Sequence, residues 1–151
     1  MRQIDVVDER RFSAKPGAVV DALTEYRDVR GQLWPEMITD YRVVEGGSGA
    51  GTRISYRLHA TRKRIRSVDA AVTTAESPTG AGTTITETDQ NSTLRTVWTV
   101  EPSGTDHSTV RVSTTWSGAG GVGGFFERRF APLGIHRLHR GVLDALAGRL
   151  A

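Results

Sequence analysis

The chain has no cysteine among its 151 residues, which excludes disulfides, thiolate metal sites and a cysteine nucleophile. No apolar run approaches the ~20 residues that a membrane-spanning helix needs. The first residues, Met1-Arg2-Gln3-Ile4-Asp5, lack the apolar core of a secretion signal. These absences predict a cytoplasmic protein without integral membrane association.

Lysine is also scarce, because Lys15 and Lys63 are the only two and the remaining basic residues are arginines. The formal net charge is +3 and the sequence pI is about 9.8. The basic residues are spread along the chain, and richness in arginine, alanine, glycine and threonine is typical of GC-rich coding. We therefore expect no nucleic-acid partner.

The order of elements is the strongest signal in the sequence. Residues 3–12 alternate as a strand, with Asp8 and Arg10 on the same face as its apolar residues. Pro16 suits the first turn of a short helix, and a second short helical piece spans Tyr26 to Leu33 before Trp34-Pro35. From Tyr41 to Trp116, apolar and polar residues then alternate with a period of two, and short polar turns interrupt them. This pattern predicts sequential antiparallel hairpins.

From about Val122 to Leu150, apolar residues recur at helical spacing, which predicts a long helix. Pro132 is expected to kink or interrupt its first part. We expect one domain over residues 1–151. Its fold class is α+β, with a curved antiparallel sheet of about seven strands around a long C-terminal helix. Two short helices lie between the first and second strands. Such a sheet and helix usually leave a hollow between them, which predicts a small-molecule site.

Several short motifs occur in an order that resembles one family. They are Phe12–Val20, Trp34-Pro35, Gly49–Thr52, Thr96–Val100, and Phe125–Arg128 followed by Ala131-Pro132. Together they resemble the START-like or Bet v 1-like (SRPBCC) helix-grip proteins, and in particular the bacterial polyketide cyclase/dehydrase-type members. The resemblance implies a hydrophobic cavity under the long helix, but it does not imply one activity, because this fold carries many functions.

Two glycine-rich stretches need separate interpretation. Gly118–Gly123 satisfies the dinucleotide pattern G-x-G-x-x-G, but no parallel strand follows the next helix, so we interpret it as a flexible hinge at the cavity mouth. Gly46–Thr52 resembles a phosphate-binding loop but lacks the required lysine, which favours a hairpin turn. The sequence therefore predicts no nucleotide cofactor.

The histidines do not form a metal site by their spacing. His136 and His139 share a helical face, but no cysteine or acidic i+4 residue supports them, so we expect one on the surface and one at the pocket margin. Glu87 and Asp89 share a strand face. If that face is inward, a desolvated carboxylate could accept a proton. The favoured interpretation is that both are solvated or pair with Arg64, Arg66 or Arg95.

The candidate ligand-binding residues are mostly aromatic and fall on predicted inward or mouth positions. They are Trp34, Met37, Tyr56, Leu58, Trp98, Trp116, Phe126 and Phe130. Plain core packing is an equal alternative for Trp98 and Trp116, and the pocket role of Tyr56, Met37 and Phe126 rests on the family resemblance. Arg53 or Arg95 would meet an acidic group of the ligand if it faced inward.

Three functions remain open at this stage. The leading hypothesis is binding of a small hydrophobic or amphipathic molecule, lipid- or polyketide-like, by a monomer or homodimer. The first alternative is a polyketide cyclase/dehydratase-type enzyme in which Tyr56, Glu87 or His136 handles protons. The second is a stress-response or protein-interaction domain with a vestigial cavity. All strand assignments depend on the register, since a shift of one residue would exchange the two faces.

Overall fold

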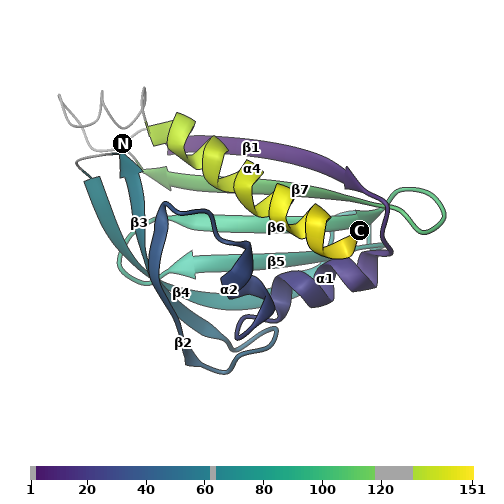
Figure 1. The fold of residues 1–151 in the computed structure, drawn as a ribbon, viewed down its shortest axis with the longest axis horizontal. Helices are drawn as coiled ribbons and strands as arrows, with labels where there is room; N and C mark the ends of the chain where they lie inside the picture. Colours follow the sequence, from purple (N-terminus) through teal and green to yellow (C-terminus); the bar gives the residue numbers. More distant parts are fainter. Residues whose placement is uncertain (1–2, 62–63, 118–130) are drawn as a thin grey trace.

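A computed structural model describes residues 3–61, 64–117 and 131–151. Its elements, in chain order (Figure 1), are β1 (Gln3–Phe12), α1 (Pro16–Thr24), α2 (Val29–Leu33), β2 (Ile38–Glu45), β3 (Arg53–Thr61), β4 (Arg64–Glu76), β5 (Thr83–Asp89), β6 (Arg95–Pro102), β7 (Ser108–Ser117) and α4 (Ala131–Leu150).

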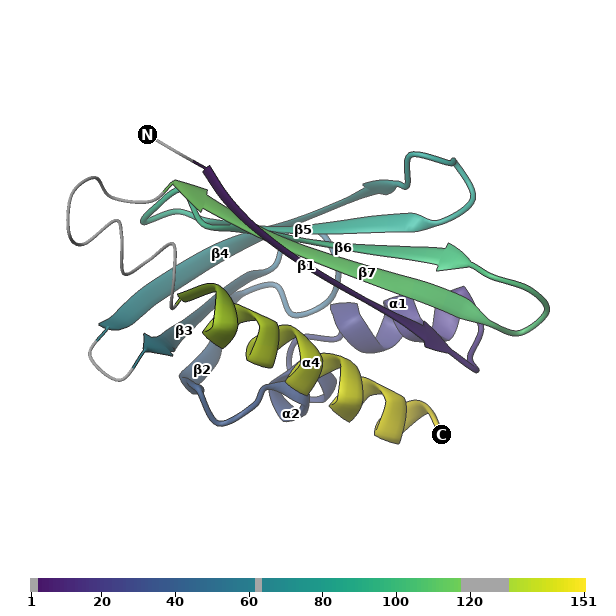
Figure 2. The ribbon, with the colours of Figure 1, turned by 90° about the horizontal axis from the view of Figure 1, so that it is seen from above.

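The strands form one seven-stranded antiparallel sheet in the order β1-β7-β6-β5-β4-β3-β2. β1 pairs with β7 from Gln3↔Ser117 to Phe12↔Ser108, so the first two strands lie at opposite edges of the sheet. α1 and α2 carry the chain between those edges. Figure 2 shows that α1, α2 and α4 all lie on the same face of the curved sheet. The predicted helix-grip architecture is confirmed.

The alternation along each strand decides which side chains face the helices. In β3, Ile54, Tyr56 and Leu58 are buried, whereas Arg53 and Arg57 lie on the other face, where they pair with Asp69 and Asp40. The opposing face of α4 buries an apolar stripe against the sheet, made of Ile135, Leu138, Val142, Leu143 and Leu146. The predicted inward face of β3 is therefore confirmed.

The second short helix is shorter than predicted. α2 begins at Val29 rather than near Tyr26, because Tyr26 to Asp28 form a turn. The Glu25 carboxylate accepts hydrogen bonds from the backbone N–H groups of Asp28 and Val29, both at 2.8 Å, and so closes the start of α2. The predicted helical stretch 122–130 and the motif Gly118–Gly123 lie outside the described residues. Pro132 lies in the first turn of α4, where its missing N–H costs no hydrogen bond.

Two local features fix the helices on the sheet. A Cβ atom on Gly141 would lie 2.9 Å from the Cβ of Pro35, so α4 approaches the chain just beyond α2 more closely than any other residue type would allow. Gly46–Thr52 is the β2–β3 hairpin loop, as predicted. The carbonyl of Gly47 in this loop accepts a hydrogen bond from the backbone N–H of Tyr26 at 2.9 Å, which holds the segment between α1 and α2.

Candidate functional site

A buried ion pair lies between α2 and the centre of the sheet. Arg30 of α2 has no exposed surface and Glu87 of β5 is only 4% exposed. The guanidinium binds the carboxylate in bidentate fashion, with Nη2–Oε1 at 3.0 Å and Nη1–Oε2 at 2.8 Å. The Tyr26 hydroxyl donates to Oε2 at 2.6 Å and the Trp98 indole N–H donates to Oε1 at 3.1 Å. Four donors thus use the whole hydrogen-bonding capacity of the carboxylate.

Aromatic rings enclose the guanidinium of Arg30. Its Cζ lies 4.7 Å from the ring centroid of Trp34, 4.9 Å from that of Trp98 and 5.3 Å from that of Tyr26. Arg30 Nη1 also donates to the carbonyl of Leu23 at 2.9 Å. Two donors of this group, Arg30 Nε and Trp34 Nε1, are buried without an acceptor among the described residues. The site therefore has hydrogen-bonding capacity left for an acceptor atom.

The favoured interpretation of Glu87 and Asp89 as solvated or paired with Arg64, Arg66 or Arg95 is wrong, because both side chains are buried. Glu87 pairs with Arg30 instead. Asp89 organises the turn after β5, since its Oδ1 accepts from the Asp69 backbone N–H at 2.9 Å and its Oδ2 accepts from the Ser92 hydroxyl at 2.6 Å.

Neither arginine expected to meet the ligand points into the interior. Arg53 is held on the outer face by Asp69, with Nη2–Oδ2 at 2.7 Å, and Arg95 is exposed. The arginine that is fully buried among the described residues is Arg30.

A second polar cluster joins β1, β7 and α4. Asp8 Oδ2 lies 2.8 Å from Nδ1 of both His136 and His139. On the other side of the His139 ring, Nε2 lies 2.7 Å from the Thr114 hydroxyl, which is in turn 2.9 Å from the Thr96 hydroxyl of β6. His139 is 1% exposed. The expectation of one surface histidine and one at a pocket margin is therefore wrong for His139, which lies within the core.

The protonation state of His139 follows from its surroundings. Burial lowers its pKa from the ordinary value near 6.5, and the hydrogen bond from its ring to Asp8 opposes this effect only in part. The imidazole is thus neutral at pH 7. Because a carboxylate only accepts hydrogen bonds, the ring proton lies on Nδ1 and faces Asp8, which leaves Nε2 as an acceptor.

This lowered pKa predicts a loss of stability on mild acidification. Unfolding exposes His139, whose pKa then returns to about 6.5. The unfolded chain therefore binds a proton that the native state does not bind. The contribution of His139 is complete above about pH 6.5 and is lost as the pH falls towards its folded-state pKa. We expect the difference in unfolding free energy between wild type and His139→Gln, from urea titrations, to shrink over this range. A difference that grows as the pH falls would contradict the lowered pKa, which NMR titration of the His139 ring measures directly.

The structure places six of the eight predicted ligand-binding residues on the helix-facing side of the sheet or at its rim. Tyr56, Leu58, Trp98 and Trp116 are buried, while Trp34 and Met37 are half-buried against the core. The rings of Trp34 and Tyr56 are in contact, with centroids 5.1 Å apart. Phe126 and Phe130 lie outside the described residues.

The three weak catalytic candidates differ in what their surroundings permit. Burial, with the charge of Glu87 adding to it, raises the pKa of Tyr56, so its hydroxyl stays protonated and does not act as a base. Glu87 already accepts four hydrogen bonds. His136, one-third exposed, pairs with Asp8. The structure thus makes His139, rather than these three, the neutral buried base.

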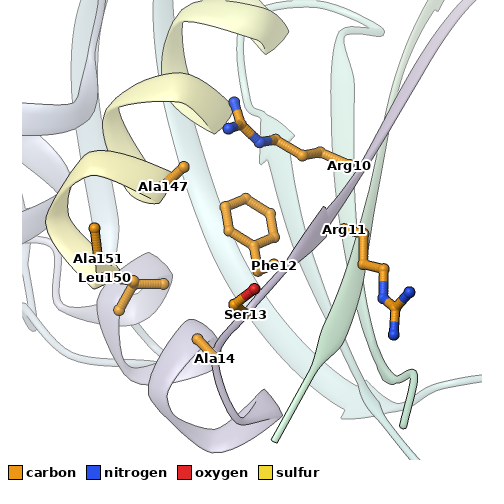
Figure 3. Close-up of a pocket in the computed structure, with 8 residues that line it drawn as sticks. All are labelled: Arg10, Arg11, Phe12, Ser13, Ala14, Ala147, Leu150 and Ala151. Atoms are coloured by element: carbon orange, nitrogen blue, oxygen red, sulfur yellow. The ribbon is translucent and has the colours of Figure 1, made fainter.

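A cavity of about 250 Å³ lies between the ends of β1 and α4. Figure 3 shows Phe12 at its centre, with Arg10 on the helix side and Arg11 directed away from the helix. Arg10 also forms an ion pair with Asp144 of α4. None of the predicted ligand-binding residues lines this cavity, whose volume is below the about 300–1,000 Å³ of common ligand pockets. It has room for one end of a small molecule.

Sequence reasoning missed Arg30, Tyr26 and the Asp8–His139 pair. The signal for Arg30 is its spacing, because Tyr26, Arg30 and Leu33 recur at helical intervals and all three are buried. Likewise His139 falls within the apolar stripe that runs from Ile135 to Leu146. A single polar residue inside an apolar stripe predicts a buried partner on a facing element.

The antiparallel sheet closed by a C-terminal helix, with polar clusters between them, defines a helix-grip protein of the START and Bet v 1 type. Solved structures agree. A START superfamily protein from Mycobacterium smegmatis shares 13% identity over 97% of this chain and 96% of that chain, with a TM-score of 0.68. The Zhui aromatase/cyclase from Streptomyces sp. R1128 shares 10% identity over 99% and 94% of the two chains, with a TM-score of 0.73. At such identities the likeness shows the fold alone.

The chain belongs to the family described as polyketide cyclase/dehydrase and lipid transport, whose model matches residues 3–151. A KanY protein, known from a solution structure, is 43% identical over 99% of both chains, with a TM-score of 0.85. No protein of curated function matches the chain. The family description covers polyketide cyclases, dehydrases and lipid transport. Among the described helices, none is long and apolar enough to cross a membrane.

Proposed function

We propose that the protein binds a small amphipathic molecule, lipid- or polyketide-like, between the sheet and α4. The observation that carries this proposal is the buried pair of donors, Arg30 Nε and Trp34 Nε1, for which the described residues supply no acceptor. An unsatisfied buried donor costs about 1–3 kcal/mol. A ligand carbonyl or carboxylate oxygen would remove that cost, while its apolar body would lie against the aromatic rings.

The chain's three tryptophans make this proposal measurable. Trp34 lies at the rim, and Trp98 and Trp116 are buried on the inner face, so a ligand in the interior changes intrinsic fluorescence. Native mass spectrometry of the protein from its own cells identifies a co-purified molecule. Titration with 8-anilinonaphthalene-1-sulfonate, an anionic amphipathic probe, measures binding directly, and displacement of the probe then measures the affinity of the natural ligand.

A matched pair of variants tests the role of the donors. Trp34→Phe keeps an aromatic ring but removes the N–H, and we expect it to weaken probe binding about 3- to 10-fold, the equivalent of one hydrogen bond. Arg53→Met removes donors from a side chain on the outer face of the sheet and is expected to alter affinity less than twofold. Equal losses in the two variants, or a protein that purifies empty and binds no probe, would overturn the proposal.

A second candidate function is catalysis of the cyclase or dehydratase type. The observation that favours it is the neutral imidazole of His139, which lies in the core between a carboxylate and a hydroxyl. A base oriented by a carboxylate and hydrogen-bonded to a hydroxyl is an arrangement that acid–base catalysis uses. Turnover of a linear polyketone, absent in His139→Gln, would separate this candidate from simple binding.

A further inference from the structure

The cluster around His139 is a continuous chain of hydrogen bonds. It runs from Asp8 Oδ2 to His139 Nδ1 at 2.8 Å, from His139 Nε2 to the Thr114 hydroxyl at 2.7 Å, and from that hydroxyl to the Thr96 hydroxyl at 2.9 Å. Four residues on β1, α4, β7 and β6 are thus connected across the concave side of the sheet. His139 and Thr114 are almost completely buried, whereas Thr96 is half-buried.

The direction of every hydrogen bond in this chain is determined by its Asp8 end. The Asp8 carboxylate can only accept, so His139 donates from Nδ1 and its neutral ring accepts at Nε2. The Thr114 hydroxyl must then donate to Nε2 and accept from Thr96. Thr96 therefore directs its one hydroxyl proton towards Thr114, and only its oxygen lone pairs remain for another molecule.

We propose that Asp8, His139, Thr114 and Thr96 form a proton-accepting relay whose outer end, the Thr96 oxygen, binds a hydroxyl group of the ligand. The relay rests on the proposed binding function and narrows its ligand class to alcohols, phenols and enols. A ligand that presents only a hydrogen-bond acceptor at this position would face the oxygen lone pairs of Thr96 and would bind more weakly. The donors Arg30 Nε and Trp34 Nε1 would instead select an acceptor group.

The same geometry describes a complete proton transfer. The ligand O–H bond breaks and its proton passes to Thr96, while the Thr96 proton passes to Thr114 and the Thr114 proton passes to His139 Nε2. The electron pair of the broken bond stays on the ligand oxygen. The result is a ligand oxyanion and an imidazolium ion next to Asp8. The reverse transfers restore the starting state, and no other reactant is needed.

Charged groups around the relay come from two elements. Arg10 of β1 is neutralised by Asp144 of α4, and His136 and Arg140 of α4 both face Asp8, with Arg140 Nε 3.7 Å from Oδ1. On the sheet side, the Trp98 ring lies edge-on to His139, with centroids 6.5 Å apart, and separates it from the Arg30–Glu87 pair. Asp8 is thus shared by His136, Arg140 and the Nδ1 atom of His139.

The test compares two chromophoric probes that differ in one hydrogen-bond donor. 4-Nitrophenol carries a hydroxyl group, and 4-nitroanisole carries a methyl ether in its place. We expect Thr96→Val to weaken 4-nitrophenol binding about 5- to 10-fold and 4-nitroanisole binding less than twofold, while Thr96→Ser keeps the wild-type preference. In wild type, absorbance at a fixed pH should show a larger ionised fraction of bound 4-nitrophenol than in His139→Gln.

The outcomes separate the relay from the binding function. If both probes bind but Thr96→Val affects them equally, or if the ionised fraction is the same in His139→Gln, the relay is overturned and binding stands. If neither probe binds and the protein purifies empty, the binding function fails and the relay loses its ligand. NMR of the His139 ring nitrogens in the free protein gives an independent result. A proton on Nε2 would reverse the polarity and overturn the relay, whereas a proton on Nδ1 supports it.

Discussion

Arg30→Met is expected to lower the free energy of unfolding by about 3–5 kcal/mol, which is typical for removing one partner of a buried ion pair. The Glu87 carboxylate would remain in the core without its counter-charge, with hydrogen bonds only from Tyr26 and Trp98. Methionine fills much of the arginine volume, so the loss reports mainly on charge rather than on a cavity. Urea unfolding followed by circular dichroism measures the change.

A double-mutant cycle separates the ion pair from the packing around it. Arg30→Met combined with Glu87→Met removes both charges, and we expect the double variant to be more stable than Arg30→Met alone. Arg53→Met is the matched control, because Arg53 pairs with Asp69 at 2.7 Å but its side chain is 35% exposed, and its loss should cost about 0–1 kcal/mol. Similar costs for Arg30→Met and Arg53→Met would show that burial does not strengthen the first pair.

Trp98→Ala is expected to cost about 3–5 kcal/mol, the usual range for deleting a large buried aromatic side chain. Trp98 is 2% exposed, donates its indole N–H to Glu87 at 3.1 Å and lies edge-on to His139. Its removal would leave a cavity between the two polar clusters and take one donor from the carboxylate.

The partner variant Trp98→Phe keeps most of the ring but removes the N–H, and we expect a loss of about 1–3 kcal/mol. Thermal and urea unfolding of the two variants give the comparison. If Trp98→Ala costs less than about 1 kcal/mol, the surrounding elements collapse onto the space, and Trp98 does not hold the two clusters in place.

The strand faces could be predicted from the sequence because alternation leaves only two choices, and a single buried face decides between them. In β3 the residues Ile54, Tyr56 and Leu58 were assigned inward from this pattern, and the structure buries all three. The succession of hairpins determined the antiparallel order in the same way. Local periodicity therefore sufficed for the strands and their faces, while the helix-grip fold was predicted from the order of the elements and the family resemblance.

The polar contacts could not be predicted because each depends on how separate elements meet. Asp8 was placed on the inward face of the first strand, but its partners His136 and His139 come from the far end of the chain. Glu87 was seen as a possible inward carboxylate, yet its partner depends on how α2 lies against β5. Cross-strand arginines were the nearest partners that a sheet pattern alone could offer, which is why Glu87 was assigned to them.

The pairing of β1 with β7 has a consequence for synthesis on the ribosome. β1 is made before β7, so β1 cannot pair until the chain has been synthesised as far as Ser117, the partner of Gln3. At about 5–20 residues per second, this delay is roughly 5–20 s. Throughout it the inner aromatic surface lacks the cover of α4, which is made later still, and has only α1 and α2 over it. During this delay, the side chains that later form the interior are accessible to small molecules and chaperones.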